Sequence, residues 1–396
     1  MAGRRLIHPE SYRGSVNRTR DHDACPGALQ VHQAADGALA RVRLPGGMLT
    51  AGQLGALARV AEELGAGTLE FTARGNLQVR GITDPTAVAG AVAAIGLLPS
   101  PTHERVRNIV ASPLSGRVGG RADVRPWVHA LDSAIQAEPE LAGLPGRFWF
   151  SLDDGSSDVS GLAADTGVHV LPDGVALLLA GRDTGVRVDP KNIVPTLISV
   201  ARRFVSMRGT AWRVAELADP DALLDDWVQD APAGAQFPPA GPQIGWIPQA
   251  GGVSAEHRVT LGAAVPLGVL TARQAHFVAA IEAPVVVTPW RSLLVCDLDE
   301  GVADTALRVL APLGLVFDES SPWLHVSACV GSPGCARSAA DVRAEAATVA
   351  EAGAVAGPVH YVGCERACGR PTAATVLVAT AAGYSPLPTP STRTVG

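Results

Sequence analysis

The sequence predicts an α+β fold that contains an internal duplication, and two observations carry this prediction. First, residues 44–53 (LPGGMLTAGQ) and residues 265–274 (VPLGVLTARQ) share six aligned identities. Second, an apolar, helix-like stretch and then a β-type stretch follow each copy. These stretches span residues 54–64 and 68–82 in the first copy, and residues 275–281 and 285–298 in the second. This order favours two related units packed about a pseudo-twofold axis, with chance similarity of two αβ units as the alternative.

The segments between and after the two copies also have an α/β pattern. Between the copies, apolar β-type runs precede a segment with apolar residues at helical spacing, and a proline- and glycine-rich linker follows. After the second copy, one helix separates two loops that contain cysteine. The expected strands are 147–152, 168–171 and 174–179, the expected helices are 195–207 and 339–352, and the linker is 230–245.

Composition narrows the classes of function. The chain has 396 residues, of which 47% are hydrophobic and 18% charged, so there is enough apolar material for several cores. The net charge of -6 argues against a nucleic-acid binder, and no apolar run approaches the length of a membrane span. The N-terminal sequence lacks the apolar core of a secretion signal, so we expect a cytoplasmic protein with no membrane and no nucleic-acid partner. Lys191 is the only lysine, which disfavours lysine-based acid catalysis.

Four of the six cysteines form two pairs in the last quarter of the sequence. Cys329 and Cys335 are six positions apart in a glycine- and proline-rich loop, and Cys364 and Cys368 are four positions apart. The first spacing is wide for structural zinc, and a loop of this kind can wrap a bulky anionic cluster. Four thiolates are the usual ligands of a [4Fe–4S] cluster. We therefore favour this cofactor over zinc and over buried or disulfide-bonded cysteines.

These cysteines and four further motifs resemble the sulfite/nitrite reductase superfamily over residues 25–380. The motifs are RVRLPGG (41–47), TARGNLQVRG (72–81), RNIVASPLSG (107–116) and LPGRFWFSLDDG (144–155). The resemblance implies two ferredoxin-like half-repeats packed together and two α/β domains for a cluster and a tetrapyrrole. It also implies that Cys329, Cys335, Cys364 and Cys368 ligate the cluster, with Cys368 facing the tetrapyrrole. The expected segments are an N-terminal tail (1–24), the first half-repeat (25–95), the first α/β domain (96–235), the second half-repeat (236–310), the second α/β domain with the cysteines (311–385) and a C-terminal tail (386–396).

The same resemblance assigns polar residues to a tetrapyrrole and anion pocket. Such a pocket needs cations because the ring carries eight carboxylates, and the planar fork of arginine binds a carboxylate through two hydrogen bonds. We expect Arg107 and Arg147 to be catalytic residues. The expected binding residues are Arg43, Arg74, Asn76, Gln78, Arg80 and Trp149. The four from 74 to 80 occupy alternate positions on one expected strand, 68–82, so we expect all four side chains to face the same way.

One motif departs from the sulfite reductases and points to another family of the superfamily. Where sulfite reductases resemble LPRKFK, with two lysines that hold and protonate the oxyanion, this chain has Arg147 and Trp149. Together with ACPG…DG…RVRLPGG at residues 24–47, this pattern resembles the precorrin-3B synthases. That resemblance implies hydroxylation of precorrin-3A at C20 by O₂, with γ-lactone formation. It also implies a [4Fe–4S] cluster, a mononuclear non-haem iron and an external electron-transfer reductase fed by NADH, since the sequence has no nucleotide-binding G-x-G-x-x-G or Walker motif.

Several alternatives stay open on the sequence alone. A siroheme- and [4Fe–4S]-dependent ferredoxin nitrite or sulfite reductase is the second candidate, and a non-catalytic tetrapyrrole or Fe–S carrier is the third. The ligands of the non-haem iron are not identified, and the polar run 21–25 is one candidate set. We expect His325 to be a hydrogen-bonded histidine near the core and Cys296 to be an inert buried thiol.

Overall fold

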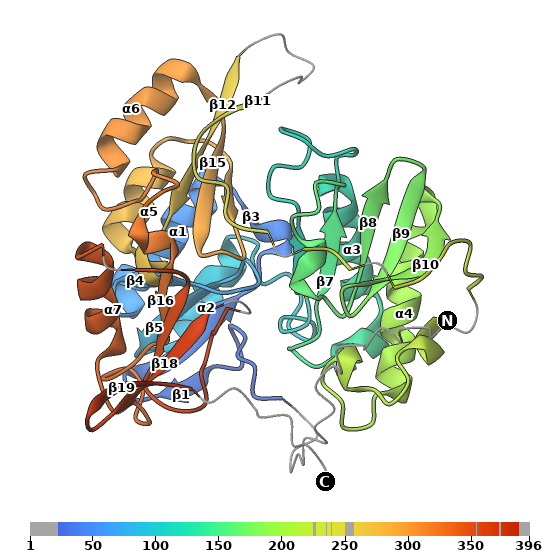
Figure 1. Ribbon diagram of the computed structural model, residues 1–396, viewed down its shortest axis with the longest axis horizontal. Helices are drawn as coiled ribbons and strands as arrows, with labels where there is room; N and C mark the ends of the chain where they lie inside the picture. Colours follow the sequence, from blue (N-terminus) through green and yellow to red (C-terminus); the bar gives the residue numbers. More distant parts are fainter. Residues whose placement is uncertain are drawn as a thin grey trace, which may run out of the picture.

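The computed structural model describes residues 23–224, 227–234, 236–238, 240–249, 257–353, 355–371 and 374–387. Figure 1 shows two lobes, with the two repeat copies and the C-terminal part in one and the segment between the copies in the other. In the part described, the fold is α+β, as the sequence predicts, with four β-sheets and the helices that cover them. No helix among these residues is long and apolar enough to cross a membrane.

Two five-stranded sheets carry the two repeat copies. The first has the order β1 (His32–Ala34), β2 (Gly37–Val42), β5 (Leu77–Ile82), β4 (Thr68–Phe71) and β13 (Val269–Thr271). The second has the order β11 (Gly245–Gln249), β12 (Arg258–Ala264), β15 (Ser292–Asp299), β14 (Val285–Val287) and β3 (Met48–Leu49). Each copy therefore gives one strand to the sheet of the other, because β13 pairs with β4 and β3 pairs with β14.

The residues that the two copies share form the exchanged strands and the starts of the helices that follow them. Thr50 directly follows β3 and Thr271 ends β13, and they cap α1 (Ala51–Leu64) and α5 (Ala272–Ala279), each in a capping box with the glutamine three residues later. Gly47 has φ of +71°, and a side chain there would overlap the backbone carbonyl of Val287 in the partner copy. The shared Gly-x-Leu-Thr-Ala-x-Gln pattern thus marks a turn, a strand and a helix start.

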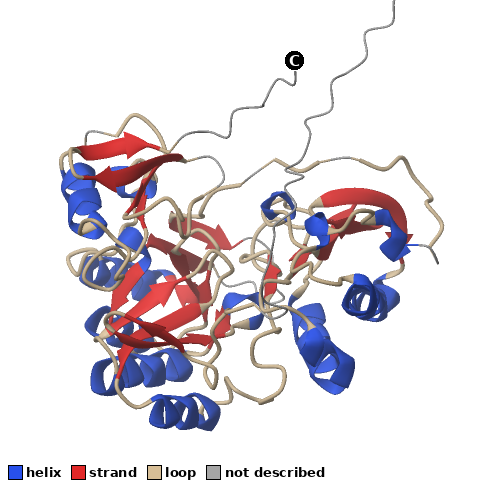
Figure 2. Ribbon diagram, turned by 90° about the horizontal axis from the view of Figure 1, so that it is seen from below, coloured by secondary structure: helices blue, strands red, loops and turns tan. Residues whose placement is uncertain are grey.

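One hydrophobic core runs through both copies. Leu49 and Leu270, from the exchanged strands, lie in the same cluster of buried residues as the inward faces of both sheets. The helices α1 and α5 pack together, and Gly55 allows a close approach to Ala279. Figure 2 shows the helices gathered along one side of these sheets. The two outer helices are α2 (Pro85–Ala94) and α6 (Glu300–Leu310).

The middle segment forms the second lobe around its own core. Its sheet has the order β10 (Arg182–Val188), β9 (Gly174–Leu179), β8 (Thr166–Leu171), β7 (Phe150–Asp153) and β6 (Ile109–Ala111). Two helices, α3 (Arg125–Ala137) and α4 (Ile193–Met207), pack together and share the core of this sheet. The helix expected at 195–207 is confirmed, as are the strands expected at 168–171 and 174–179.

The last sheet carries the cysteine loops. It has the order β16 (Val326–Ala328), β17 (Val359–Val362), β18 (Thr375–Thr380) and β19 (Gly383–Pro386), and α7 (Val342–Glu351) confirms the helix expected there. The parallel pairing of β16 and β17 brings their carboxyl ends to one edge, where α/β sheets commonly bind ligands. Short 3-10 helices lie at Pro45–Gly47, Pro139–Gly143, Ser160–Leu162, Pro190–Asn192, Val214–Glu216, Asp221–Leu224, Pro266–Gly268 and Pro322–Leu324.

The β-type stretches 68–82 and 285–298 are hairpins rather than single strands. In the first, a turn joins β4 and β5: Thr72 Oγ1 accepts hydrogen bonds from the backbone N of Arg74 at 3.4 Å and of Asn76 at 3.1 Å. The expectation of one strand face is therefore wrong, since Arg74 and Asn76 lie in the turn and only Gln78 and Arg80 lie on β5. The Gly-Asn pair at residues 75–76 is the sequence signal for this turn.

Candidate functional site

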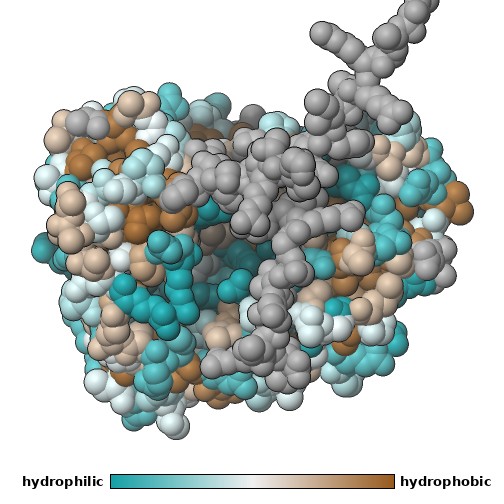
Figure 3. All heavy atoms as spheres, turned by 60° about the horizontal axis from the view of Figure 1, so that its bottom comes forward, coloured by the Kyte–Doolittle hydropathy of each residue, from teal (hydrophilic) through white to brown (hydrophobic). Residues whose placement is uncertain are grey.

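A cavity of about 490 Å³ lies where the repeat copies, the middle segment and the last sheet meet. Its wall combines four arginines with three tryptophans, and so offers both positive charge and flat apolar surface. These residues are Arg74, Arg213, Arg291, Arg370, Trp149, Trp290 and Trp323. Figure 3 shows the surface hollowed between the two lobes, with hydrophilic residues inside the hollow. A wall of this kind suits a flat ring that carries carboxylates.

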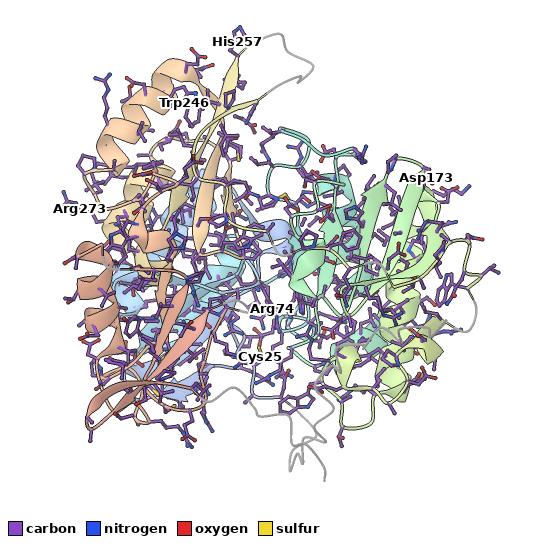
Figure 4. All side chains as sticks on the ribbon, viewed as in Figure 1. Cys25, Arg74, Asp173, Trp246, His257 and Arg273 are labelled. Atoms are coloured by element: carbon purple, nitrogen blue, oxygen red, sulfur yellow. The ribbon has the colours of Figure 1, made fainter. Side chains whose placement is uncertain are left out.

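Arg74 and Trp149, both expected from the sequence to bind a ligand, line this cavity together with Arg213. The Cζ atoms of Arg74 and Arg213 each lie 5.9 Å from the centre of the Trp149 ring. Burial, and then the charge of Arg213, lower the pKa of Arg74 to about 10. Figure 4 shows Arg74 between the two lobes. The two guanidinium groups lie near one indole ring, so an anion bound between them and the ring would be stabilised by both charges.

Arg213 is a cavity residue that the sequence did not reveal. Its Nε donates to both carboxylate oxygens of Asp165, at 2.9 and 2.7 Å, and the backbone N of Trp149 donates to Asp165 at 3.0 Å. Asp165 is 1% exposed, and its hydrogen bonds hold both Arg213 and the backbone of Trp149 in place behind the cavity wall. Because Arg213 and Asp165 are 48 residues apart and lie in no shared motif, only the fold brings them together.

Arg43 is buried, at 2% exposure, and its guanidinium is only partly satisfied. Nη2 lies 3.5 Å from the sulfur of Cys25, whereas Nε and Nη1 have no hydrogen-bond partner among the described residues. Arg41 also contacts this thiol, with Nη1 at 3.0 Å. Burial, and then the charge of Arg41, lower the pKa of Arg43 to about 9. Unpaired buried donors of this kind favour a negatively charged ligand nearby.

Three other expected site residues are engaged with partners inside the protein. The Nε and Nη2 atoms of Arg107 donate to the two oxygens of Asp132, at 2.7 and 2.8 Å. The side-chain oxygen of Asn76 accepts from the backbone N of Leu44 at 2.8 Å. The side-chain oxygen of Gln78 accepts from Nε of Arg41, at 2.9 Å. These contacts hold the scaffold, and a direct role of the three residues in the reaction stays a prediction.

Arg147 is not among the residues that line the cavity, although Nη1 of Arg74 donates to the backbone carbonyl of the preceding Gly146 at 3.3 Å. Its side chain is exposed, and its Cζ lies 5.2 Å from the centre of the Trp212 ring. Its backbone N donates to Asp23 at 2.8 Å, which holds the start of the described chain against this loop. The structure therefore brings two of the expected site residues, Arg74 and Trp149, to the cavity wall.

The four expected cluster cysteines lie on two neighbouring loops. Cys329 directly follows β16, and Cys364 lies just after β17, the parallel strand beside it. All four thiols are free in this structure. Burial raises the pKa of the Cys368 thiol, and the charges of Cys329, Cys364 and Cys335 raise it further. The four thiols are thus close enough to influence one another.

Four free thiols on two neighbouring loops are donors of the type that an iron–sulfur cluster takes. Among the described His, Cys, Asp and Glu side chains, no group of three converges closely enough to hold one metal ion. A [4Fe–4S] cluster is a cage of irons and sulfides, so its four thiolates stand farther apart than those around one ion. Gly369 and Arg370 line the cavity, and they directly follow Cys368. The cysteine site and the cavity therefore share a wall.

Side chains from both repeat copies hold the cysteine loops. Arg80, on β5, donates to the backbone carbonyl of Gly334 at 3.0 Å and is paired with Asp36 through two hydrogen bonds. Arg291, from the second copy, donates to the backbone carbonyl of Gly369 at 2.8 Å. The expected tetrapyrrole contact of Arg80 stays a prediction, because its guanidinium supports the loop before Cys335.

The cysteine site can also be reached from outside. A second, more open hollow of about 460 Å³ is lined by Arg337, Cys364, Glu365 and Arg366. Cys368 is itself exposed. A partner that transfers electrons could therefore approach the thiols without entering the cavity.

Three further expectations have different outcomes. Cys296 is fully buried on β15, and burial raises the pKa of its thiol to about 11, which confirms a buried thiol. The expectation for His325 is wrong, because this histidine is exposed at the end of a 3-10 helix and lines the cavity. Of the candidate iron set, residues 21 and 22 lie outside the described residues. Asp23 and Cys25 lie against arginines, an unfavourable environment for a cation.

Comparison with known proteins agrees with this architecture. Residues 32–89 match the family described as the nitrite/sulfite reductase ferredoxin-like half domain. A precorrin-3B synthase from Sinorhizobium sp is 28% identical over 379 residues, which cover 91% of this chain and 81% of that protein. A chloroplastic ferredoxin–nitrite reductase from Zea mays is 36% identical over 128 residues, which cover 30% of this chain and 22% of that protein. The solved structure of the Mycobacterium tuberculosis NirA protein matches with a TM-score of 0.69 and 19% identity, covering 84% of this chain and 69% of that chain. The chain thus has the nitrite/sulfite reductase fold, and it resembles a precorrin-3B synthase over nearly its whole length.

Proposed function

We propose that this chain is a precorrin-3B synthase, an O₂-dependent monooxygenase that hydroxylates precorrin-3A at C20 in aerobic cobalamin biosynthesis. The observation that carries the proposal is the cavity of arginines and tryptophans that shares a wall with the four cysteines. Similarity to a protein of that name over 91% of the chain supports the choice of substrate.

In the proposed reaction, one atom of O₂ becomes the C20 hydroxyl group and the other becomes water. The γ-lactone closes when the carboxyl oxygen of the ring A acetate adds to the ring carbon next to C20, across the double bond that receives the hydroxyl group, and the carboxyl proton passes to the new oxygen at C20. NADH supplies two electrons through an external reductase, which would dock over the outer hollow beside Cys364. A [4Fe–4S] cluster held by the four cysteines would supply single-electron transfer between that reductase and the cavity. We assign no residue of this chain to the mononuclear non-haem iron that the resemblance implies.

The chain's own residues bind and orient the macrocycle in this proposal. Arg74 and Arg213 receive carboxylates, because their guanidinium groups face the cavity and are held in place by burial and by Asp165. Trp149 packs against the ring face, since it lines the cavity and the Cζ atoms of both arginines lie 5.9 Å from the centre of its ring. Arg43 adds a third positive group from behind this wall.

A siroheme-dependent nitrite or sulfite reductase is the second candidate. It is favoured by the similarity of about a third of the chain to ferredoxin–nitrite reductases. It is disfavoured by the supply of protons, because reduction of these anions consumes several protons at the site. The sole lysine, Lys191, is exposed and paired with Asp189. The cavity has Trp149 at the position where the second lysine of the sulfite reductase motif LPRKFK would stand.

The test is a spectrum followed by an assay with labelled oxygen. Protein purified without air should show broad Fe–S absorption without siroheme bands. With precorrin-3A, a reductase, NADH and ¹⁸O₂, it should form a hydroxylated lactone that contains one ¹⁸O atom. Siroheme bands together with reduction of nitrite or sulfite would overturn the proposal in favour of the reductase. An Fe–S protein that forms no labelled product would overturn the proposal in favour of the third candidate, a non-catalytic tetrapyrrole or Fe–S carrier.

A further inference from the structure

A chain of three residues connects the cavity wall to Cys368. Ser327, on β16, lines the cavity, and its Oγ lies 2.8 Å from Nδ1 of His360 on the neighbouring β17. Nε2 of the same ring lies 3.0 Å from the backbone carbonyl oxygen of Cys368. His360 is fully buried, so water does not compete for either nitrogen.

The acceptors fix the direction of these hydrogen bonds. A backbone carbonyl oxygen only accepts, so Nε2 of His360 carries the hydrogen and donates to Cys368. In the neutral ring Nδ1 then accepts, and the hydroxyl group of Ser327 donates to it. The carbonyl oxygen of Val359, at 3.3 Å, is a second acceptor for the single hydroxyl hydrogen, but Nδ1 of His360 lies closer, at 2.8 Å.

The backbone carbonyl oxygens of Cys368 and Gly369 thus both accept a hydrogen bond from a side chain that is linked to the cavity wall. Ser327 acts on Cys368 through His360, and Arg291, another cavity residue, donates directly to Gly369 at 2.8 Å. Hydrogen bonds around a ligating cysteine fix its orientation and tune the metal group it holds.

We propose that His360 is a positioning residue for Cys368 and that Ser327 sets the ring of His360 for this task. The inference rests on the proposed function only in that Cys368 is taken as a cluster ligand. Neither residue is assigned a step of the reaction, although Ser327 lines the cavity. Both act on the geometry of the thiol at the wall shared by the cluster and the cavity.

The first test uses the protein as purified with its cluster. His360→Leu removes the donor, and His360→Gln keeps an amide N–H in place of Nε2. Loss of one hydrogen bond near the cluster should change the equilibrium constant for reduction by about threefold to tenfold, and His360→Gln should restore most of it. Ser327→Ala should shift the same constant in the same direction by a smaller factor. Ser385→Ala, on an exposed part of the same sheet, is the matched control and should leave it unchanged.

The second test uses the protein after the cluster has been removed with a chelator. Alkylation of Cys368 by iodoacetamide, followed by mass spectrometry of its peptide, should be several times faster in His360→Leu and Ser327→Ala than in wild type or His360→Gln. Equal rates in wild type and Ser327→Ala, together with equal reduction constants, would overturn the inference, even if His360→Leu fails to fold. Purified protein without any cluster would instead contradict the proposed function, and the alkylation rates would still decide the role of His360.

Discussion

The pair formed by Arg107 and Asp132 gives the sharpest test of whether an expected catalytic arginine is held as part of the scaffold. The side chain of Arg107 is 5% exposed and that of Asp132 is 16% exposed, and two hydrogen bonds of 2.7 and 2.8 Å join them. Asp132→Ala leaves the guanidinium buried without its carboxylate. Removal of one partner from a buried ion pair costs about 3–5 kcal/mol. Because water reaches part of Asp132, we expect a value near the lower end, about 3 kcal/mol.

Urea unfolding followed by circular dichroism measures this loss. The matched control is Asp304→Ala, which removes the partner of Arg308 on the exposed face of α6 and should cost less than about 1 kcal/mol. The double variant Arg107→Leu with Asp132→Leu should be more stable than Asp132→Ala, because no charge is left buried. A loss for Asp132→Ala no larger than that of the control would refute the argument from burial and leave Arg107 free to act on the substrate.

Three further predictions concern the cavity, a buried acid and the cysteines. Arg74→Leu should weaken the binding of uroporphyrin, an octacarboxylate ring, by about tenfold to a hundredfold in a fluorescence titration, because a charge-assisted contact is lost; unchanged affinity would remove Arg74 from the site. Burial raises the pKa of Asp158 to about 6, so the stability this group contributes is present at low pH and is lost as the pH rises through 6. Asp158→Asn should therefore be more stable than wild type at pH 8, by up to about 3 kcal/mol, and the difference measured by urea unfolding should shrink towards pH 5; a constant difference would contradict the assignment. Cys364→Ser should abolish the visible Fe–S absorption while Cys296→Ala keeps it, because the second thiol is buried away from the cysteine loops; full absorption in Cys364→Ser would exclude it as a ligand.

The sequence predicts the features that local chemistry encodes. The duplication was visible because Thr50 and Thr271 sit in capping boxes, whose residues must recur at fixed spacing. The cysteine pairs were visible because each pair lies on one loop. The exchange of strands was not visible, since two or three residues of β3 or β13 do not specify which sheet they join.

The candidate site could be predicted only in part. Trp149 was visible as a departure from a motif, whereas Arg213 is held at the cavity by Asp165, which lies just before β8. Arg80 and Arg107 carry the expected charge, but the fold supplies Asp36 and Asp132 as their partners. A motif gives the type of a residue and its place in the chain, but the partner of a side chain depends on the tertiary structure.

The exchanged strands also bear on how this molecule can assemble and how it can be divided. Contacts between β13 and β4, or between β3 and β14, join residues about two hundred positions apart, so the last strand of each sheet is added only after the whole middle lobe has been synthesised. Until then the emerging first copy presents an open β4 edge, which is a surface prone to pairing with other chains. A gene cut between the two copies would therefore produce two fragments with unfinished sheets, and their recovery in soluble form would depend on both being made together.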